Sequence, residues 1–449
     1  MGIFDFFKKR AKRAKIEKHF YNFPSLSPSE LEKNELLGLL NNANINDYAK
    51  AISHQARSLS VNNPIISGYL KTIESEILGD RGITLDLSTP NKELNKRIEG
   101  SFALWRGSSQ NGELDFYDIE SLALIYLLRD GECFLHLSES QEGLRVEIID
   151  NHNIASDFSD ESQGIAFGIK KDAKNNPISY FVYDGEGRLF EVNAKAILHL
   201  HKKLDIRQHR GLSDFASIIT PAHQKDKFRS AELRKARLQS EITGFIIKNN
   251  SDLADELLNG EEEHKKSIQT SVEVGKMTYI DEDVKPIFTE SHNAANMESF
   301  ITQTDREIAK GLGISYATLT GNLTDVNYSS IRHGGSEQRR QFRRLQNFLV
   351  RKMHNKIYER WLLNELKLCK LSTKEYQDAL LYYSFKPQGW EYIDPHKETN
   401  ANALAIHTGQ KTLSEILRST GKELDTHIEE LKKEKELQKL LKELGRGNG

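Results

Sequence analysis

The chain has 449 residues, and its apolar content of 37% is enough for roughly two to four domains with buried cores. Its 63 basic and 65 acidic residues leave a formal net charge of −2. Proteins that bind nucleic acid tightly are usually strongly basic, so this charge argues against that class. No run of roughly eighteen apolar residues and no signal peptide occur, so we expect a cytoplasmic protein without stable membrane association. Because only Cys133 and Cys369 are present, far apart in the sequence, we expect no disulfide framework and no thiolate metal site. We also expect no other metal site and no cofactor, for which the sequence shows no motif.

Charge is segregated along the chain. The segment 1–40 is basic near its start, with Lys8, Lys9, Arg10, Lys12, Arg13, Lys15 and Lys18. A solvated helix is the simplest interpretation of this segment, while contact with a membrane or with nucleic acid stays open. The middle of the chain is acidic and contains Glu261, Glu262 and Glu263.

The first half predicts an α+β body over residues 41–212. A helix is expected after Asn63-Pro64, a good cap and first-turn pair, with an apolar face that ends at Gly79. A second helix is expected from Asp115 to the turn at Asp130-Gly131. Short runs then predict antiparallel strands between turn residues: ECFLHL, RVEIID, IAFGI, SYFVY, RLFEV and AILHL.

The second half predicts mostly helices. A long helix begins near Ser213, and Pro221 within it predicts a kink or a restart, since an interior proline costs roughly 3 kcal/mol. Short, acidic and partly strand-like elements follow over 244–290, and a further helix reaches Leu312. Another long helix is expected over roughly 329–366, and Thr412 with Glu415 forms a capping box in the helical C-terminal part.

The usual catalytic motifs are absent. The sequence contains no phosphate-binding loop, no H-E-x-x-H and no G-x-S-x-G elbow. His199 and His201 share one side of a strand, as in some metal sites, but no third ligand is evident and a strand-end structural role is favoured. The carboxylates of Asp130, Glu132 and Asp150 could serve a nuclease, yet they stand at turns and strand ends where acids are common. We therefore predict that the protein is not an enzyme.

Several segments, taken in order, resemble the portal proteins of lambda-like tailed bacteriophages. They are NNPIISGYLKTIESEILGDRGI, LRDGECFLHL, AILHLHK followed by RQHRGLSDFASII, REIAKGLGISYATLTGNLTDVNYSSIR, and GWEYIDPHKETNANALAIHTGQKT. Together they run from about residue 60 to 415. No one short motif is specific, but the ordered set is, above all the fourth segment.

The resemblance implies a homo-oligomeric ring, typically a dodecamer, at one capsid vertex. The genome is packaged and ejected through this ring, and double-stranded DNA passes it without sequence-specific contact. The implied partners are terminase, the major capsid or scaffold protein, and head-completion or tail adaptor proteins. The implied localisation is the virion, after assembly in the host cytoplasm.

The resemblance also implies a portal fold with an α/β wing, a two-helix stem, a small α/β clip inserted between the stem helices, and a helical crown. The expected division is a wing at 41–212, stem helices at 213–243 and 291–320, a clip at 244–290, a tunnel loop at 321–328, a tunnel helix and wing return at 329–395, and a crown at 396–449.

Three groups of candidate functional residues follow from this division. In the tunnel loop they are Asn322, Thr324, Asp325, Asn327 and Tyr328. In the tunnel helix they are Arg332, Arg339 and Arg343, which lie within an arc of roughly 40° and would meet either DNA or acids of the neighbouring subunit. In the clip they are Glu261, Glu262 and Glu263, which would contribute to docking of terminase or adaptors.

Two alternatives stay open at this point. One is a nucleic-acid-processing enzyme of the packaging apparatus, such as a nuclease or a head maturation protease. The other is a helical scaffold unrelated to phage. The loop at 321–328 could likewise be an ordinary surface connection between helices.

Overall fold

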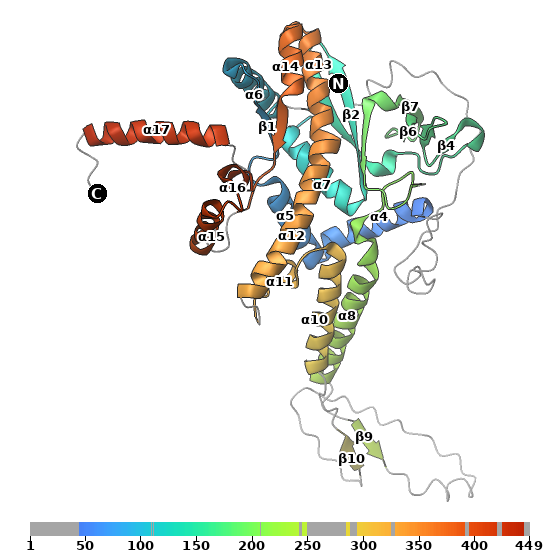
Figure 1. Ribbon diagram of the computed structural model, residues 1–449. Coiled ribbons are helices and arrows are strands. Elements are labelled where there is room, and N and C mark those ends of the chain that lie inside the picture. Colours follow the sequence, from blue (N-terminus) through green and yellow to red (C-terminus); the bar gives the residue numbers. More distant parts are fainter. Residues whose placement is uncertain are drawn as a thin grey trace, which may run out of the picture. The chain divides into compact units, whose positions relative to one another are not determined.

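The computed structural model describes residues 45–108, 110, 112–206, 208–241, 245–248, 284–287, 294–324, 328–390, 395–419 and 424–443 (Figure 1). The predicted basic segment 1–40 and the clip residues Glu261, Glu262 and Glu263 lie outside these ranges, as do Asp325 and Asn327. Two compact units are formed: unit 1 joins the chain up to Ile219 with the chain from Ala309 onward, and unit 2 is Thr220–Ile308. None of the helices in the described ranges is both long and apolar enough to cross a membrane.

Unit 1 begins with two consecutive helices, α4 (Ile45–Asn62) and α5 (Pro64–Leu78). The predicted cap is confirmed, because the side chain of Asn63 accepts hydrogen bonds from the backbone N–H groups of the second and third residues of α5. The predicted apolar face of α5 is also confirmed as core, and its buried residues include Ile66, Tyr69, Leu70, Ile73 and Ile77. Gly79 ends the helix with a φ of 59°.

The strand β1 (Thr84–Leu87) and the helix α6 (Lys92–Arg106) come next, followed by α7 (Phe116–Arg129). As predicted, α7 begins next to Asp115, and the structure adds that Asp115 forms a reciprocal capping box with Asp118. Along the chain, α7 leads into β2 (Glu132–Ser140), against which it packs. β2 pairs antiparallel with β3 (Gly143–Ile149) and with β8 (Ile197–His201), in the order β3-β2-β8.

A second sheet has the order β4-β5-β6-β7. Its strands are β4 (Ile165–Ala166), β5 (Ile169–Lys171), β6 (Pro177–Tyr183) and β7 (Leu189–Asn193), all paired antiparallel. The expectation of one strand at IAFGI is wrong, because Phe167 and Gly168 turn the chain with φ values of 52° and 76°. At Gly168 an added Cβ would lie 2.6 Å from the carbonyl oxygen of Ala155, so only glycine permits this turn.

Short 3-10 turns connect these elements at Asn151–Asn153, Glu161–Gln163, Ala194–Ala196 and Asp214–Ser217. The last of them, η4, is capped by Ser213 and precedes α8 (Ile219–Glu241). Of the two outcomes expected at Pro221, the restart is confirmed. Pro221 falls in the first turn of α8, where no intrahelical hydrogen bond is lost.

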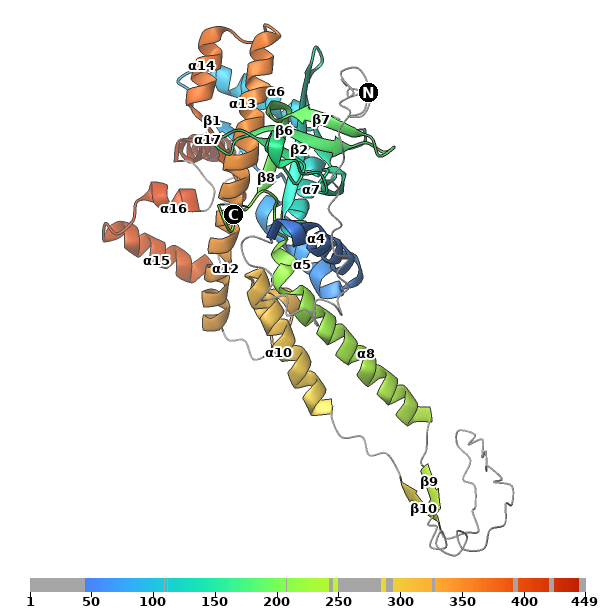
Figure 2. The same cartoon turned by 90° about the vertical axis from the view of Figure 1, so that its right-hand side faces the viewer.

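Unit 2 contains most of α8 and of α10 (Ala294–Leu312), which lie side by side as an antiparallel pair (Figure 2). The rings of Phe228 and Phe300 pack with their centroids 4.4 Å apart, and Lys225 forms a buried ion pair with Asp305. The two strands β9 (Phe245–Lys248) and β10 (Val284–Ile287) pair antiparallel within this unit.

The chain then returns to unit 1. The described helices are α11 (Tyr316–Thr320), α12 (Tyr328–Leu349) and, after a π-helical turn at Val350–His354, α13 (Asn355–Lys367). The predicted long helix over 329–366 is thus confirmed, with the π turn as an addition. α14 (Thr373–Leu381) and β11 (Tyr383–Lys386) follow, and β11 pairs with β1, close to 300 residues earlier in the chain.

An aromatic core joins these distant parts of unit 1. The ring of Phe102 on α6 contacts the rings of Trp105, Tyr358, Trp361 and Phe385. Three further helices complete the described chain: α15 (Pro395–His407), α16 (Leu413–Ser419) and α17 (Leu424–Glu443). The predicted capping box between Thr412 and Glu415 is confirmed at the start of α16.

Candidate functional site

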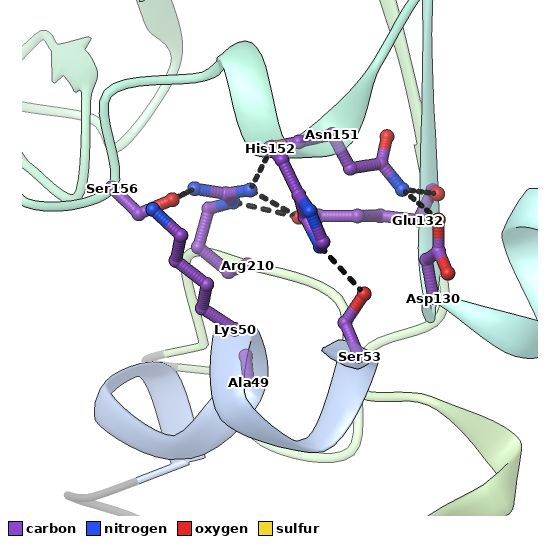
Figure 3. Close-up of a pocket in the computed structure, with 9 residues that line it drawn as sticks. All are labelled: Ala49, Lys50, Ser53, Asp130, Glu132, Asn151, His152, Ser156 and Arg210. Carbon is purple, nitrogen blue, oxygen red and sulfur yellow. Dashed lines mark hydrogen bonds and ion pairs between the residues drawn. The ribbon is translucent and has the colours of Figure 1, made fainter. Parts of the chain in front are cut away.

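A buried polar cluster contains the acidic residues that could have served an enzyme (Figure 3). Glu132, at the start of β2, is 3% exposed. Its Oε1 accepts from Nε of Arg210 at 2.8 Å, and its Oε2 lies 2.9 Å from Nε2 of His199 and accepts from the backbone N–H of Gly211 at 2.7 Å. Although burial opposes ionisation, the charge of Arg210 and the bond to His199 hold the pKa of Glu132 well below its usual range.

The two aspartates are engaged in the same manner. Arg57 on α4 donates to Asp130 at 2.6 Å and to Asp150 at 3.0 Å, so one guanidinium joins both carboxylates. Asp150 also caps the turn that follows it by accepting from the N–H of His152. A nuclease needs carboxylates that are free to bind metal or activate water, and these are occupied by arginines.

Two glycines bring this cluster together. A Cβ on Gly131 would lie 2.2 Å from the backbone carbon of Leu212, and a Cβ on Gly211 would lie 2.2 Å from the carbonyl oxygen of Gly131. Only glycine permits this approach of two backbones. The sequence segments Asp130-Gly131-Glu132 and Arg210-Gly211, each present in the portal-like motifs, therefore meet in space.

The cavity beside the cluster is too small for a substrate. It measures about 10 Å³, which is room for about one water molecule, and its lining includes Lys50, Ser53 and His152. Oγ of Ser53 lies 3.3 Å from Nε2 of His152. Burial, together with the charges of Arg57 and His54, lowers the pKa of His152 to about 4, and so its ring is neutral near pH 7. A serine and histidine in contact here have no space for an acyl group.

The histidine pair on β8 packs as part of the protein interior. The rings of His199 and His201 stack with centroids 4.0 Å apart, and the ring of His199 also stacks on Phe134 at 4.1 Å. In the portion of the chain that the structure describes, no three His, Cys, Asp or Glu side chains are grouped so as to hold a metal ion.

The polar loop that follows α11 is held at its start by a separate set of contacts. Ser315 caps α11 by accepting from the N–H of Thr318, and Gln338 on α12 accepts from the N–H of Ser315 at 3.1 Å and from Oγ1 of Thr318 at 2.9 Å. Gly321 ends α11 in the left-handed region with φ 70°. The loop therefore starts from a short helix that is fastened to α12.

The first loop residues are exposed. Asn322 accepts from the N–H of Thr324 at 2.9 Å, which is a local turn, and the side chain of Leu323 between them is 64% exposed. Asp325 and Asn327, also expected in the loop, lie outside the described residues, while Tyr328 is the first residue of α12. Asn322 and Thr324 are thus adjacent at a solvent-facing turn.

The helix α12 has two distinct faces. Its buried face carries Phe342 and Gln346, and Gln346 donates to the carbonyl of Ile77 at 3.1 Å and to that of Gln388 at 3.0 Å. Its exposed face, continued by the π-helical turn, carries a row that lines an open groove of about 580 Å³: Arg340, Arg343, Arg344, Asn347 and, in the turn, Arg351. We call this row the arginine face.

Of the predicted basic stripe, only Arg343 belongs to the arginine face. Its guanidinium lies over the ring of Trp390, 5.6 Å from the centroid. Arg339 is half-buried beside the face, and the side chain of Arg332 is outside the described residues. The sequence reasoning missed Arg340, Arg344 and Arg351. Counting helical spacing from the apolar Phe342 would have placed them on the opposite side of the helix.

The glycines at the start of α12 do not interrupt it, because Gly334 and Gly335 lie within the helix. A Cβ on Gly334 would lie 3.8 Å from the Cβ of Ser315, an ordinary contact. Both glycines are therefore accommodated inside a formed helix.

Comparisons with known proteins agree with the sequence motifs. The sequence profile of the family described as "Phage portal protein, lambda family" matches residues 40–346. A probable portal protein of Halomonas phage phiHAP-1 is 23% identical over 409 residues, which cover 84% of this chain and 78% of that protein.

Similar solved structures include the neck of a native gene transfer agent particle computed with C12 symmetry, at a TM-score of 0.47 and 16% identity, covering 82% of this chain and 93% of that one. Another is an HK97 family phage portal protein from Corynebacterium diphtheriae, at a TM-score of 0.37 and 12% identity, covering 77% of this chain and 96% of that one. On the strength of the profile match, which spans more than half of its length, the chain belongs to the lambda family of phage portal proteins.

Proposed function

We propose that this protein forms a closed ring at the unique vertex of a phage capsid, through which the genome is packaged and ejected. The family match over residues 40–346 carries the proposal. From the family resemblance we expect a dodecamer. In such a ring each subunit contacts the next through two different surfaces, and the last subunit contacts the first. The proposed localisation is the virion, after assembly in the host cytoplasm, and the proposed role is structural and not catalytic.

The parts of the portal fold are assigned as follows. We infer a wing from 41–212 and 329–395, and the pairing of β1 with β11 supports joining these two stretches. We infer a stem from 213–243 and 291–320, supported by the antiparallel pair α8 and α10. The clip at 244–290 and the crown at 396–449 follow from their places in the chain.

The tunnel loop is proposed to face the DNA. Exposure of Asn322 and Thr324 at a polar turn supports this, and Asp325, Asn327 and Tyr328 complete the segment. DNA in transit has to be centred without being held, because each neutralised phosphate adds affinity that a motor must break. Small neutral polar side chains with one acid meet that requirement.

The clip is proposed to dock terminase during packaging and head-completion or tail adaptor proteins afterwards. Replacing Glu261, Glu262 and Glu263 by Lys should leave rings intact and weaken terminase binding in a salt-dependent manner. Binding that is the same at low and high salt would remove this role from the three glutamates. The outer wing is proposed to contact the major capsid or scaffold protein.

Two measurements test the function. Negative-stain images of purified protein should show rings, and a stable monomer at micromolar concentration would contradict the proposal. In a packaging assay, Asp325→Lys should assemble rings but stall with partly filled heads, more so at low salt, because a repelling ring becomes one that attracts phosphates. The control Glu161→Lys changes an exposed acid on the wing and should package normally.

A further inference from the structure

The arginine face of α12 is fixed in its exposed orientation. Leu349 on the opposite side is fully buried, and Gln346 is 1% exposed and hydrogen-bonded to two backbone carbonyls. The helix therefore cannot rotate to bury Arg340 or Arg344 against its own subunit. Along the axis the row from Arg340 to Arg351 extends about 16 Å, at 1.5 Å per residue.

The guanidinium groups of the arginine face are largely unpaired in the described part of the subunit. Among the described residues, Arg340, Arg344 and Arg351 form no ion pair, and Arg343 faces the ring of Trp390. Guanidinium groups bind carboxylates and phosphates in a forked geometry, and several in a row favour a partner with several anionic groups. The face thus has the form of a docking surface for an extended acidic element.

The helix α17 is a second surface that the described part of the chain leaves exposed. Every described side chain from Glu430 to Lys439 is exposed, including Leu431 at 49% and Leu437 at 55%. Helices of this length owe most of their stability to packing of one face against another element. Among the described residues, Glu430 and Glu434 form no ion pair.

The two rows have the same spacing. Glu430, Glu434 and Leu437 follow the helical interval i, i+4, i+7. Arg340, Arg344 and Asn347 follow it too, so two glutamates one turn apart, about 6 Å in rise, match two arginines one turn apart. Leu437 then comes level with Asn347, at the uncharged point of the arginine face.

We propose that α17 of one subunit docks on the arginine face of α12 of the neighbouring subunit, with Glu430 and Glu434 paired to Arg340 and Arg344. This rests on the proposed ring, whose heterologous contacts bring two different patches of the same chain together. The formal net charge of −2 differs from the strongly basic balance of proteins that hold nucleic acid tightly, which favours this occupant over nucleic acid. A cover from the next subunit also accounts for the exposed leucines of α17.

A charge-swap series tests the pairing. Arg340→Glu with Arg344→Glu, and separately Glu430→Arg with Glu434→Arg, should each raise the subunit concentration needed for ring formation by about tenfold at low salt. The chain carrying all four substitutions should return to the wild-type value, because the charges are again opposite. High salt should shrink the differences, since exposed pairs are screened.

The matched control is Lys96→Glu with Lys374→Glu, which reverses two exposed lysines on α6 and α14 and should leave assembly unchanged. Failure of the four-substitution chain to recover assembly would overturn the proposal. So would an arginine variant that assembles normally but no longer retains duplex DNA, because that result assigns the face to DNA.

A cross-linking measurement distinguishes the neighbouring subunit from the same chain. With Cys369→Ser as background, Arg344→Cys and Glu434→Cys in one chain should give a ladder of covalent oligomers with a short thiol cross-linker. A cross-linked species that stays monomeric, or no cross-link in intact rings, would contradict docking on the neighbour. Absence of rings in the wild type would instead refute the proposed function, whereas wild-type rings that ignore the swaps refute only this inference.

Discussion

Unit 1 has two places where arginines gather, and they differ in what the guanidinium groups face. In the buried cluster, Arg57 and Arg210 are matched to Asp130, Asp150 and Glu132. On the arginine face, Arg340 and Arg344 form no ion pair with any carboxylate that the structure describes. Arginines paired inside the subunit stabilise its fold, while arginines left without a counter-charge are available to another molecule.

The difference follows from solvation. A guanidinium buried at 5% exposure, as at Arg210, has lost most of its water and needs a carboxylate at hydrogen-bond distance. An exposed guanidinium keeps its water and costs little until a partner replaces that water. Substitutions in the two places should therefore affect different measurements.

The largest effect is expected in the buried cluster. Arg210→Met should lower the free energy of unfolding by about 3 to 5 kcal/mol, because it leaves the carboxylate of Glu132 buried without its arginine. Urea denaturation of the purified protein measures this. Arg145→Met removes an exposed pair with Glu142 and should cost about 1 kcal/mol or less. Equal losses of unfolding free energy in the two variants would contradict the distinction between buried and exposed arginines.

The glycine between the two acids of the cluster comes second. Gly131→Ala should lower the free energy of unfolding by roughly 2 to 3 kcal/mol, because its φ is 90° and the new methyl would meet the backbone of Leu212. Gly143→Ala is a matched control with φ 129° and open space around the position. A similar loss at both positions would mean that backbone strain, and not the close approach, decides the cost.

The buried cluster should also make folding sensitive to acid. The pKa of His152 is lowered to about 4, below the 6.5 of an unfolded chain. Between these values the unfolded state binds more protons, so stability falls as the pH decreases through that window. The lowered pKa of Glu132 adds a further loss at still lower pH.

Urea midpoints between pH 7.5 and 4.5 measure this dependence. His152→Asn should reduce the slope without abolishing it, because burial also lowers the pKa of His209 to about 4 and that of His201 to about 3. His407→Asn, at an exposed position, should leave the slope unchanged. An unchanged slope in the His152 variant would assign the acid sensitivity to other groups.

The smallest effect on stability is expected on the arginine face. Arg344→Met should change the free energy of unfolding of the subunit by less than about 0.5 kcal/mol, as for other exposed side chains. Its effect should appear in assembly and not in subunit stability. A decrease of more than about 1 kcal/mol in the unfolding free energy of the isolated subunit would mean that Arg344 stabilises the fold, as the buried arginines do.

The sequence by itself determined the local elements and the family. Asn63 and Thr412 were expected to cap helices and do so, because a cap bonds to backbone groups two or three residues away. The family was evident from an ordered set of segments, above all REIAKGLGISYATLTGNLTDVNYSSIR, and the profile match confirms it.

Only the tertiary structure decided which charges are paired. Glu132 and Arg210 are 78 residues apart, and their contact depends on the approach of two glycine backbones that no local pattern reveals. The break of the expected strand at Gly168 likewise depends on Ala155, a residue of another segment. The exposed row on α12 was identified incompletely for the same physical reason: the burial of Phe342 and Gln346 against distant segments sets which side of the helix faces solvent.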